Sequence, residues 1–119
     1  MAAFGGLTCL TFSQNGEVLV EPLRISHEAL DQLEGSILLL FTGKERSASE
    51  ILSEQDEKCK QGDSEMTDNL HQIKELGVET RKYLENGQVN MLGELLHAHW
   101  EIKKKRSRGM SDPFIDECY

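Results

Sequence analysis

The most constraining feature of this sequence is an apolar run followed by the start signal of a helix. Residues 37–41 are all apolar. Such a short, unbroken run predicts a strand, here spanning residues 36–42, that is buried on both faces. A capping box comes next, because Ser47 can accept a hydrogen bond from the amide three residues later and Glu50 can reach back to the Ser47 amide. The sequence therefore predicts a strand, a short loop and a helix N-terminus over residues 36–50.

The loop and the first turn of this helix combine positive charge with hydroxyl groups. Lys44 and Arg46 supply the cations, and Ser47 and Ser49 supply the hydroxyls. Cationic side chains and the free amides of a helix N-terminus attract anions. A phosphate-bearing ligand near these residues is therefore the first hypothesis. The alternative is an ordinary strand-to-helix junction with a good cap, and the motif on its own favours that alternative.

The overall charge limits the classes of partner. The 119 residues carry a net charge of −8, from 13 basic and 21 acidic residues. A protein that coats nucleic acid needs a broad basic face, so no nucleic-acid partner is expected. A small anion in a local cationic pocket is compatible with this charge. With 38% hydrophobic and 29% charged residues, the composition is that of a soluble globular domain.

The cysteines and the apolar segments indicate a cytoplasmic location. Cys9, Cys59 and Cys118 are odd in number and far apart, so neither a disulfide scaffold nor a zinc site is expected. Reduced thiols are typical of cytosolic proteins. The longest apolar run is much shorter than the roughly 20 residues that cross a bilayer, so no membrane partner is expected.

A hairpin is predicted near the beginning of the sequence. Residues 7–12 and 17–21 are rich in the β-branched and bulky side chains that favour strands. Between them, Asn15 and Gly16 supply the pair of positive-φ residues that a tight hairpin turn requires. The expected sheet is this antiparallel hairpin plus a third strand over residues 36–42.

The rest of the chain is predicted to form four or five helices that pack on the strands. Their expected positions are 27–33 capped by Ser26, 48 to about 60, 64–85 capped by Asp63 or Ser64, 88 to about 105, and a last helix with Pro113 in its first turn, capped by Ser111 or Asp112. The long helix carries an apolar stripe made of Met66, Leu70, Ile73, Gly77, Thr80 and Leu84. The fold class is therefore α+β, with residues 1–47 mainly in strands and residues 48–119 mainly in helices.

Two patterns near the C-terminus raise the question of further chemistry. Residues 103–106 are all basic, and the favoured interpretation is a helix C-terminus whose cations oppose the negative end of the helix dipole. The functional alternative is a phosphate contact, with Lys103 and Ser111 as weaker candidates. His97 and His99 are two positions apart on a helix and point to nearly opposite sides, so no metal site is predicted.

The sequence resembles GHMP-type small-molecule kinases and, within that superfamily, the D-glycero-D-manno-heptose 7-phosphate kinases. The similarity spans essentially all 119 residues. The segments that carry it are 2–7, 20–26, 41–43, 46–52, 73–76, 93–97 with Trp100 and Lys103, and 110–113 with Ile115 and Asp116.

This resemblance implies an α+β fold of two lobes, in which the chain is the start of the C-terminal lobe. It also implies transfer of the ATP γ-phosphate to a sugar phosphate, with Mg²⁺ as a further cofactor. In such enzymes the strand, loop and helix around Arg46 and Ser47 lie on the acceptor side of the cleft. The resemblance thus favours the same residues, Arg46, Ser47 and Ser49 with Lys44, as contacts of the substrate.

The resemblance also implies that important parts of the kinase lie outside this sequence. The phosphate-binding loop and the catalytic aspartate of the family precede the part that matches Met1, and its late glycine-rich motif follows the part that matches Tyr119. We therefore expect residues 1–119 to be a partial domain that contains no catalytic residue, binds neither ATP nor Mg²⁺ alone and is inactive in isolation. The alternative is a non-catalytic interaction module, or an inactive remnant, that self-associates through exposed edges.

Overall fold

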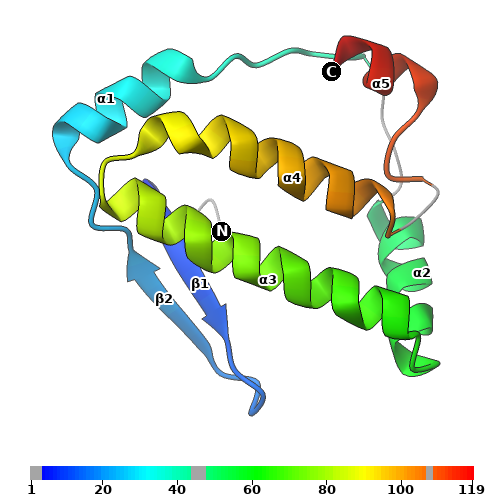
Figure 1. Ribbon diagram of the computed structural model, residues 1–119. Coiled ribbons are helices and arrows are strands. Elements are labelled where there is room, and N and C mark those ends of the chain that lie inside the picture. Colours follow the sequence, from blue (N-terminus) through cyan, green and yellow to red (C-terminus); the bar gives the residue numbers. More distant parts are fainter. Residues whose placement is uncertain (1–3, 44–47, 107–108) are drawn as a thin grey trace. The chain divides into compact units, whose positions relative to one another are not determined.

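The computed structural model describes residues 4–43, 48–106 and 109–119 (Figure 1). These residues form an antiparallel hairpin, five α-helices and a short 3₁₀-helix, so the predicted α+β class is confirmed. The elements are β1 (Thr8–Phe12), β2 (Val18–Pro22), α1 (His27–Ser36), α2 (Ala48–Lys60), α3 (Ser64–Glu85), η1 (Val89–Met91), α4 (Leu92–Lys104) and α5 (Pro113–Cys118).

The chain divides into two compact units. Unit 1 consists of Met1–Ile37 and Glu79–Leu92, and unit 2 consists of Leu38–Val78 and Gly93–Tyr119. Unit 1 contains the hairpin, α1, η1 and the last turns of α3. Unit 2 contains α2, α5, the first four turns of α3 and nearly all of α4.

The hairpin has the predicted strands and a different turn. Its register runs from Thr8 opposite Pro22 to Phe12 opposite Val18. In the turn, the Gly16 amide donates to the Ser13 carbonyl over 3.0 Å, and Gly16 has a φ of 85°. The prediction of two positive-φ residues is wrong, because no described non-glycine residue has a positive φ. The turn contains a single left-handed residue, Gly16, so Asn15 needs no positive φ.

The predicted third strand over residues 36–42 is also wrong. Helix α1 continues to Ser36, and within the described part of the chain the only sheet is the pair β1–β2. The five apolar side chains of residues 37–41 are between 62% and 94% exposed. A strand is stabilised by a hydrogen-bonded neighbour and by packing on its faces. The described residues provide neither for this run, so it stays irregular (Figure 1).

An apolar cluster forms the core of unit 1. It contains Ala29 and Leu33 from α1, Leu84 from α3 and Val89 from η1, with Leu7, Ile25 and Leu92 packed around it. Helix α1 begins as predicted, because the Ser26 hydroxyl accepts a hydrogen bond from the Ala29 amide. The spacing of Ala29 and Leu33 places both side chains on one face of α1, which is the face that becomes buried.

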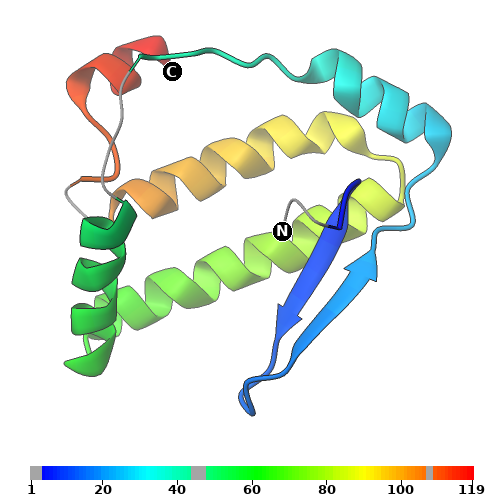
Figure 2. The same ribbon diagram turned by 180° about the vertical axis from the view of Figure 1, so that it is seen from behind.

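An arginine connects the hairpin to helix α3 at the edge of this cluster. Arg81 donates from Nη1 to Glu21 of β2 over 3.2 Å and from Nε to Glu85 over 3.3 Å. Glu85 also accepts a hydrogen bond from the Arg24 amide. Figure 2 shows the hairpin beside the C-terminal turns of α3, which is the arrangement that these bonds hold.

The helices of unit 2 begin and end close to the predicted residues. Helices α2 and α3 have the expected bounds, and the Asp63 carboxylate caps α3 by accepting from the Met66 amide. Asp112 caps α5 in the same way, with Pro113 in the first turn. The expected helix over residues 88–105 is shorter, because a 3₁₀ turn comes first and α4 begins only at Leu92. No helix in the described ranges is long and apolar enough to cross a membrane.

Candidate functional site

The predicted substrate contacts lie around the first turn of helix α2. Lys44, Arg46 and Ser47 lie outside the described residues, so their role stays a prediction. Ser49 lies in the first turn of α2. The two weaker candidates also belong to unit 2: Lys103 lies in the last turn of α4, and Ser111 lies just before α5.

The structure brings the neighbourhoods of Ser49 and Ser111 together. A Cβ atom on Gly109 would lie 3.6 Å from Cγ1 of Ile51, so the segment that leads to Ser111 packs against the first turns of α2. Met110 is buried in the same segment, and the Ser111 hydroxyl donates to the Asp116 carboxylate over 2.8 Å. Two of the predicted contacts therefore lie on neighbouring segments.

A pocket lies at the other end of helix α2. It has a volume of 310 Å³ and is formed by the C-terminal part of α2, the first turns of α3 and the end of α4. Figure 1 shows α3 and α4 side by side and antiparallel, so the start of α3 meets the end of α4. The side chains that line the pocket are Lys58, Asp63, Glu65, Met66, Asp68, Asn69, Gln72, Lys105 and Arg106.

A buried asparagine organises this pocket. Asn69 is only 9% exposed. Its Nδ2 donates to the Ile102 carbonyl over 2.7 Å, and its Oδ1 accepts from Arg106 Nε over 3.1 Å. Lys58 Nζ donates to the Arg106 carbonyl over 3.1 Å and pairs with Glu54 at 2.8 Å. The Nε of Arg106 is therefore bonded to a buried side chain that is itself hydrogen-bonded to α4, which orients the guanidinium group.

The cations near this pocket also affect a neighbouring histidine. Burial lowers the pKa of His99, and the positive charges of Lys103 and Arg106 lower it further. The charge of the basic segment at the end of α4 therefore reaches the interior of unit 2. The lowered pKa favours the neutral form of the His99 imidazole.

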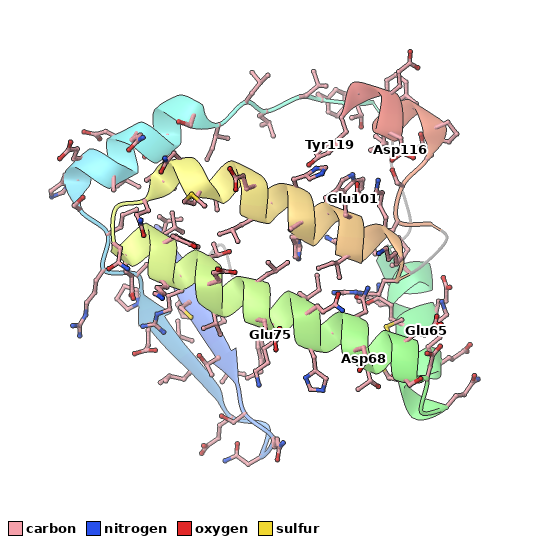
Figure 3. All side chains as sticks on the ribbon, in the orientation of Figure 1. Glu65, Asp68, Glu75, Glu101, Asp116 and Tyr119 are labelled. Carbon is pink, nitrogen blue, oxygen red and sulfur yellow. The ribbon has the colours of Figure 1, made fainter. Side chains whose placement is uncertain are left out.

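An aromatic cluster lies between α4 and the C-terminal residue. The rings of His97 and Tyr119 are stacked with their centroids 5.6 Å apart, and Trp100 lies 5.9 Å from Tyr119. Figure 3 shows Tyr119 and Glu101 close to each other in this region. Among the described residues, no group of three His, Cys, Asp or Glu side chains is placed to hold a metal ion.

Comparisons with known proteins show that this chain is similar to part of two sugar kinases. A D-glycero-α-D-manno-heptose 7-phosphate kinase of Campylobacter jejuni is 31% identical over 118 residues, which are 99% of this chain and 34% of that protein. A bifunctional fucokinase/GDP-fucose pyrophosphorylase of Arabidopsis thaliana is 26% identical over 100 residues, which are 84% of this chain and 10% of that protein. The chain is homologous to part of these sugar kinases.

This homology bears out the resemblance to GHMP-type kinases over nearly the whole chain. The chain spans about a third of the length of the heptose 7-phosphate kinase that it matches. No protein-family model matches the chain, and no solved structure has a significant similarity to it. The region shared with the heptose 7-phosphate kinase covers 118 of the 119 residues, so it contains both the α2 N-terminus and the Asn69 pocket.

Sequence reasoning missed the Asn69 pocket, although one signal for it was present. The predicted apolar stripe of the long helix included Leu70, which is 39% exposed, and left out its neighbour Asn69, which is buried. Asn69 lies three residues after Met66 and four before Ile73, so it shares their face of the helix. A polar residue at an inward position predicts a hydrogen-bonded network there.

Proposed function

We propose that this chain supplies one region of an ATP-dependent sugar-phosphate kinase. The observation that carries this proposal is the homology of 99% of the chain to a heptose 7-phosphate kinase. In this role the chain contributes packing within one lobe of the kinase and the acceptor side of its substrate pocket. The ATP site and Mg²⁺ belong to other regions of the complete enzyme, since phosphoryl transfer depends on loops that position the phosphates and on metal ions that neutralise their charge.

The substrate contacts in this proposal are Arg46, Ser47 and Ser49, with Lys44 beside them. Arginine suits this task because its planar guanidinium group can bind two phosphate oxygens at once. Ser49 lies in the first turn of α2, where backbone amides add positive potential. Together these groups would orient the sugar phosphate so that one of its hydroxyls faces the γ-phosphate of ATP.

The exposed run over residues 37–41 supports a role inside a larger assembly. Five consecutive apolar side chains that are 62% to 94% exposed are unusual on a soluble protein. In the complete kinase we expect these side chains to be buried against regions of the protein that lie outside this chain.

The experiment is a chimera in which this chain replaces the homologous region of the Campylobacter jejuni kinase. ADP release is measured with ATP, Mg²⁺ and D-glycero-D-manno-heptose 7-phosphate. We expect the chimera to be active and this chain alone to be inactive. Arg46→Ala in the chimera should raise the KM for the sugar phosphate at least about tenfold, because a hydrogen bond to a charged group is worth about 1.5–3 kcal/mol.

Lys60→Ala is the matched control for Arg46→Ala. It removes a cation from the opposite end of helix α2, where Lys60 is exposed and paired with Asp56. The KM should therefore change less than twofold. A folded chimera without activity, or an equal loss in both variants, would contradict the proposed role of the loop.

A second candidate function is a non-catalytic module that self-associates. The same exposed run favours it, together with the hairpin, whose two outer edges have no partner strand in the described part of the chain. Sedimentation equilibrium distinguishes the two functions. A monodisperse dimer that dissociates on Leu39→Ser favours the module, whereas a chain that assembles only with the other kinase regions favours the kinase.

A further inference from the structure

The Asn69 pocket has two walls of opposite character. Helix α2 and the end of α4 supply Lys58, Lys105 and Arg106, which are all cations. Helix α3 and its cap supply acidic and amide side chains, namely Asp63, Glu65, Asp68, Asn69 and Gln72. Figure 3 labels Glu65 and Asp68 in the first turns of α3, and both side chains belong to the acidic rim of the pocket.

The cationic wall offers Arg106 and Lys105 to an anion, since Lys58 is already paired with Glu54. Arg106 is oriented by the hydrogen bond from its Nε to the buried carboxamide of Asn69. Lys58 is tied to the same segment through the Arg106 carbonyl, which lies 3.1 Å from its Nζ. The Lys105 side chain is exposed at the edge. A guanidinium group that is already oriented loses less entropy when it binds a phosphate than a mobile one does.

The opposite wall suits hydroxyl groups. Carboxylates only accept hydrogen bonds, and the amide of Gln72 can both donate and accept. The pocket volume of 310 Å³ lies at the lower end of the roughly 300–1,000 Å³ typical of small-molecule sites. A ligand with one anionic group and several hydroxyls in a small volume matches both walls, whereas a nucleoside triphosphate would bring its charges against the acidic rim.

We propose that the Asn69 pocket is a second binding site, for a phosphorylated monosaccharide, separate from the predicted contacts at the start of α2. Ser49 and Lys58 are nine residues apart on α2, which is about 14 Å along a helix that rises 1.5 Å per residue. The phosphate group binds Arg106 and Lys105, and the sugar hydroxyls bind the side chains of α3.

The test is a titration of the full chain followed by ¹H–¹⁵N NMR, with glucose 6-phosphate as the probe. Glucose and inorganic phosphate are titrated in parallel at constant ionic strength. We expect saturable shifts of the Asn69 and Gln72 side-chain amides with glucose 6-phosphate, binding by phosphate that is about tenfold weaker, and none with glucose. No catalytic step is involved, so the outcome is independent of the proposed function.

Three variants make the result specific. Arg106→Ala should weaken the binding of glucose 6-phosphate about tenfold, and Lys105→Ala should weaken it about threefold. Lys60→Ala removes an exposed cation outside the pocket, so it should change this affinity less than twofold. Lys105→Ala keeps the test decisive if Arg106→Ala fails to fold. The proposal is overturned by the absence of saturable shifts, by equal affinity for phosphate and glucose 6-phosphate, or by an equal effect of Lys60→Ala.

Discussion

Unit 1 has an apolar cluster at its core, whereas unit 2 contains a buried asparagine whose hydrogen bonds join two helices. In unit 1, Leu33 and Leu84 belong to one apolar cluster. In unit 2, Asn69 joins helix α3 to the end of α4 through the Ile102 carbonyl and Arg106. An apolar cluster excludes water and offers nothing to a polar ligand. A polar network places charged groups in fixed orientations, so unit 2 is where we expect binding.

The largest effect is expected in the apolar cluster of unit 1. Leu84→Ala should lower the free energy of unfolding by about 2–5 kcal/mol, because it removes buried methyl groups and leaves a cavity. Urea unfolding followed by circular dichroism measures this. Val78→Ala, at a position of the same helix that is 66% exposed, is the control and should change stability by less than about 0.5 kcal/mol. Equal effects would show that the cluster does not stabilise the chain.

The next largest effect tests the network of unit 2. Asn69→Ala removes the hydrogen bonds to Arg106 Nε and to the Ile102 carbonyl, which should cost about 1–3 kcal/mol. The same unfolding measurement checks it. Gln72→Ala removes a similar amide from an exposed position one turn away and should cost less than about 0.5 kcal/mol. If the two variants unfold alike, the comparison between the units fails.

A smaller effect concerns the pH dependence of unit 2. The pKa of His99 in the folded chain is below its ordinary value of 6.5, because of burial and then of Lys103 and Arg106. Below pH 6.5 the unfolded chain therefore binds a proton that the folded chain does not. The contribution of His99 to the free energy of unfolding is therefore fully present above pH 6.5 and is lost as the pH falls below this value.

Urea midpoints measured between pH 7.5 and pH 5.5 test this prediction. The midpoint should fall with pH in the unmodified chain and fall less in His99→Gln. His71→Gln replaces an exposed histidine of α3 and is the matched control. A pH dependence that His99→Gln leaves unchanged would refute the assignment.

The smallest effect on stability is expected in the exposed run. Leu39 is 94% exposed, so Leu39→Ser should change the free energy of unfolding of this chain by less than about 0.5 kcal/mol. In the chimeric kinase, by contrast, the same change should lower the melting temperature, because there we expect the run to be buried. A loss above about 1 kcal/mol in the isolated chain would show that the run packs within it.

The sequence predicts the elements that local chemistry determines. Asp63 and Asp112 cap their helices as expected, because a carboxylate next to free amides needs no distant partner. The conformation of residues 36–42 could not be predicted in this way. A strand requires a hydrogen-bonded neighbouring strand, and the described residues do not supply one for this run. The Asn69 network escaped prediction for the same reason, because it joins residues that are more than 30 positions apart.

The activity of the chimeric kinase tests the central claim most directly. The claim is that this chain can take the place of the homologous third of a heptose 7-phosphate kinase. We predict that the chimera releases ADP only when the sugar phosphate is present. Arg46→Ala should weaken this ADP release, and Lys60→Ala should not. A chimera that folds, binds ATP and still transfers no phosphate would contradict the account.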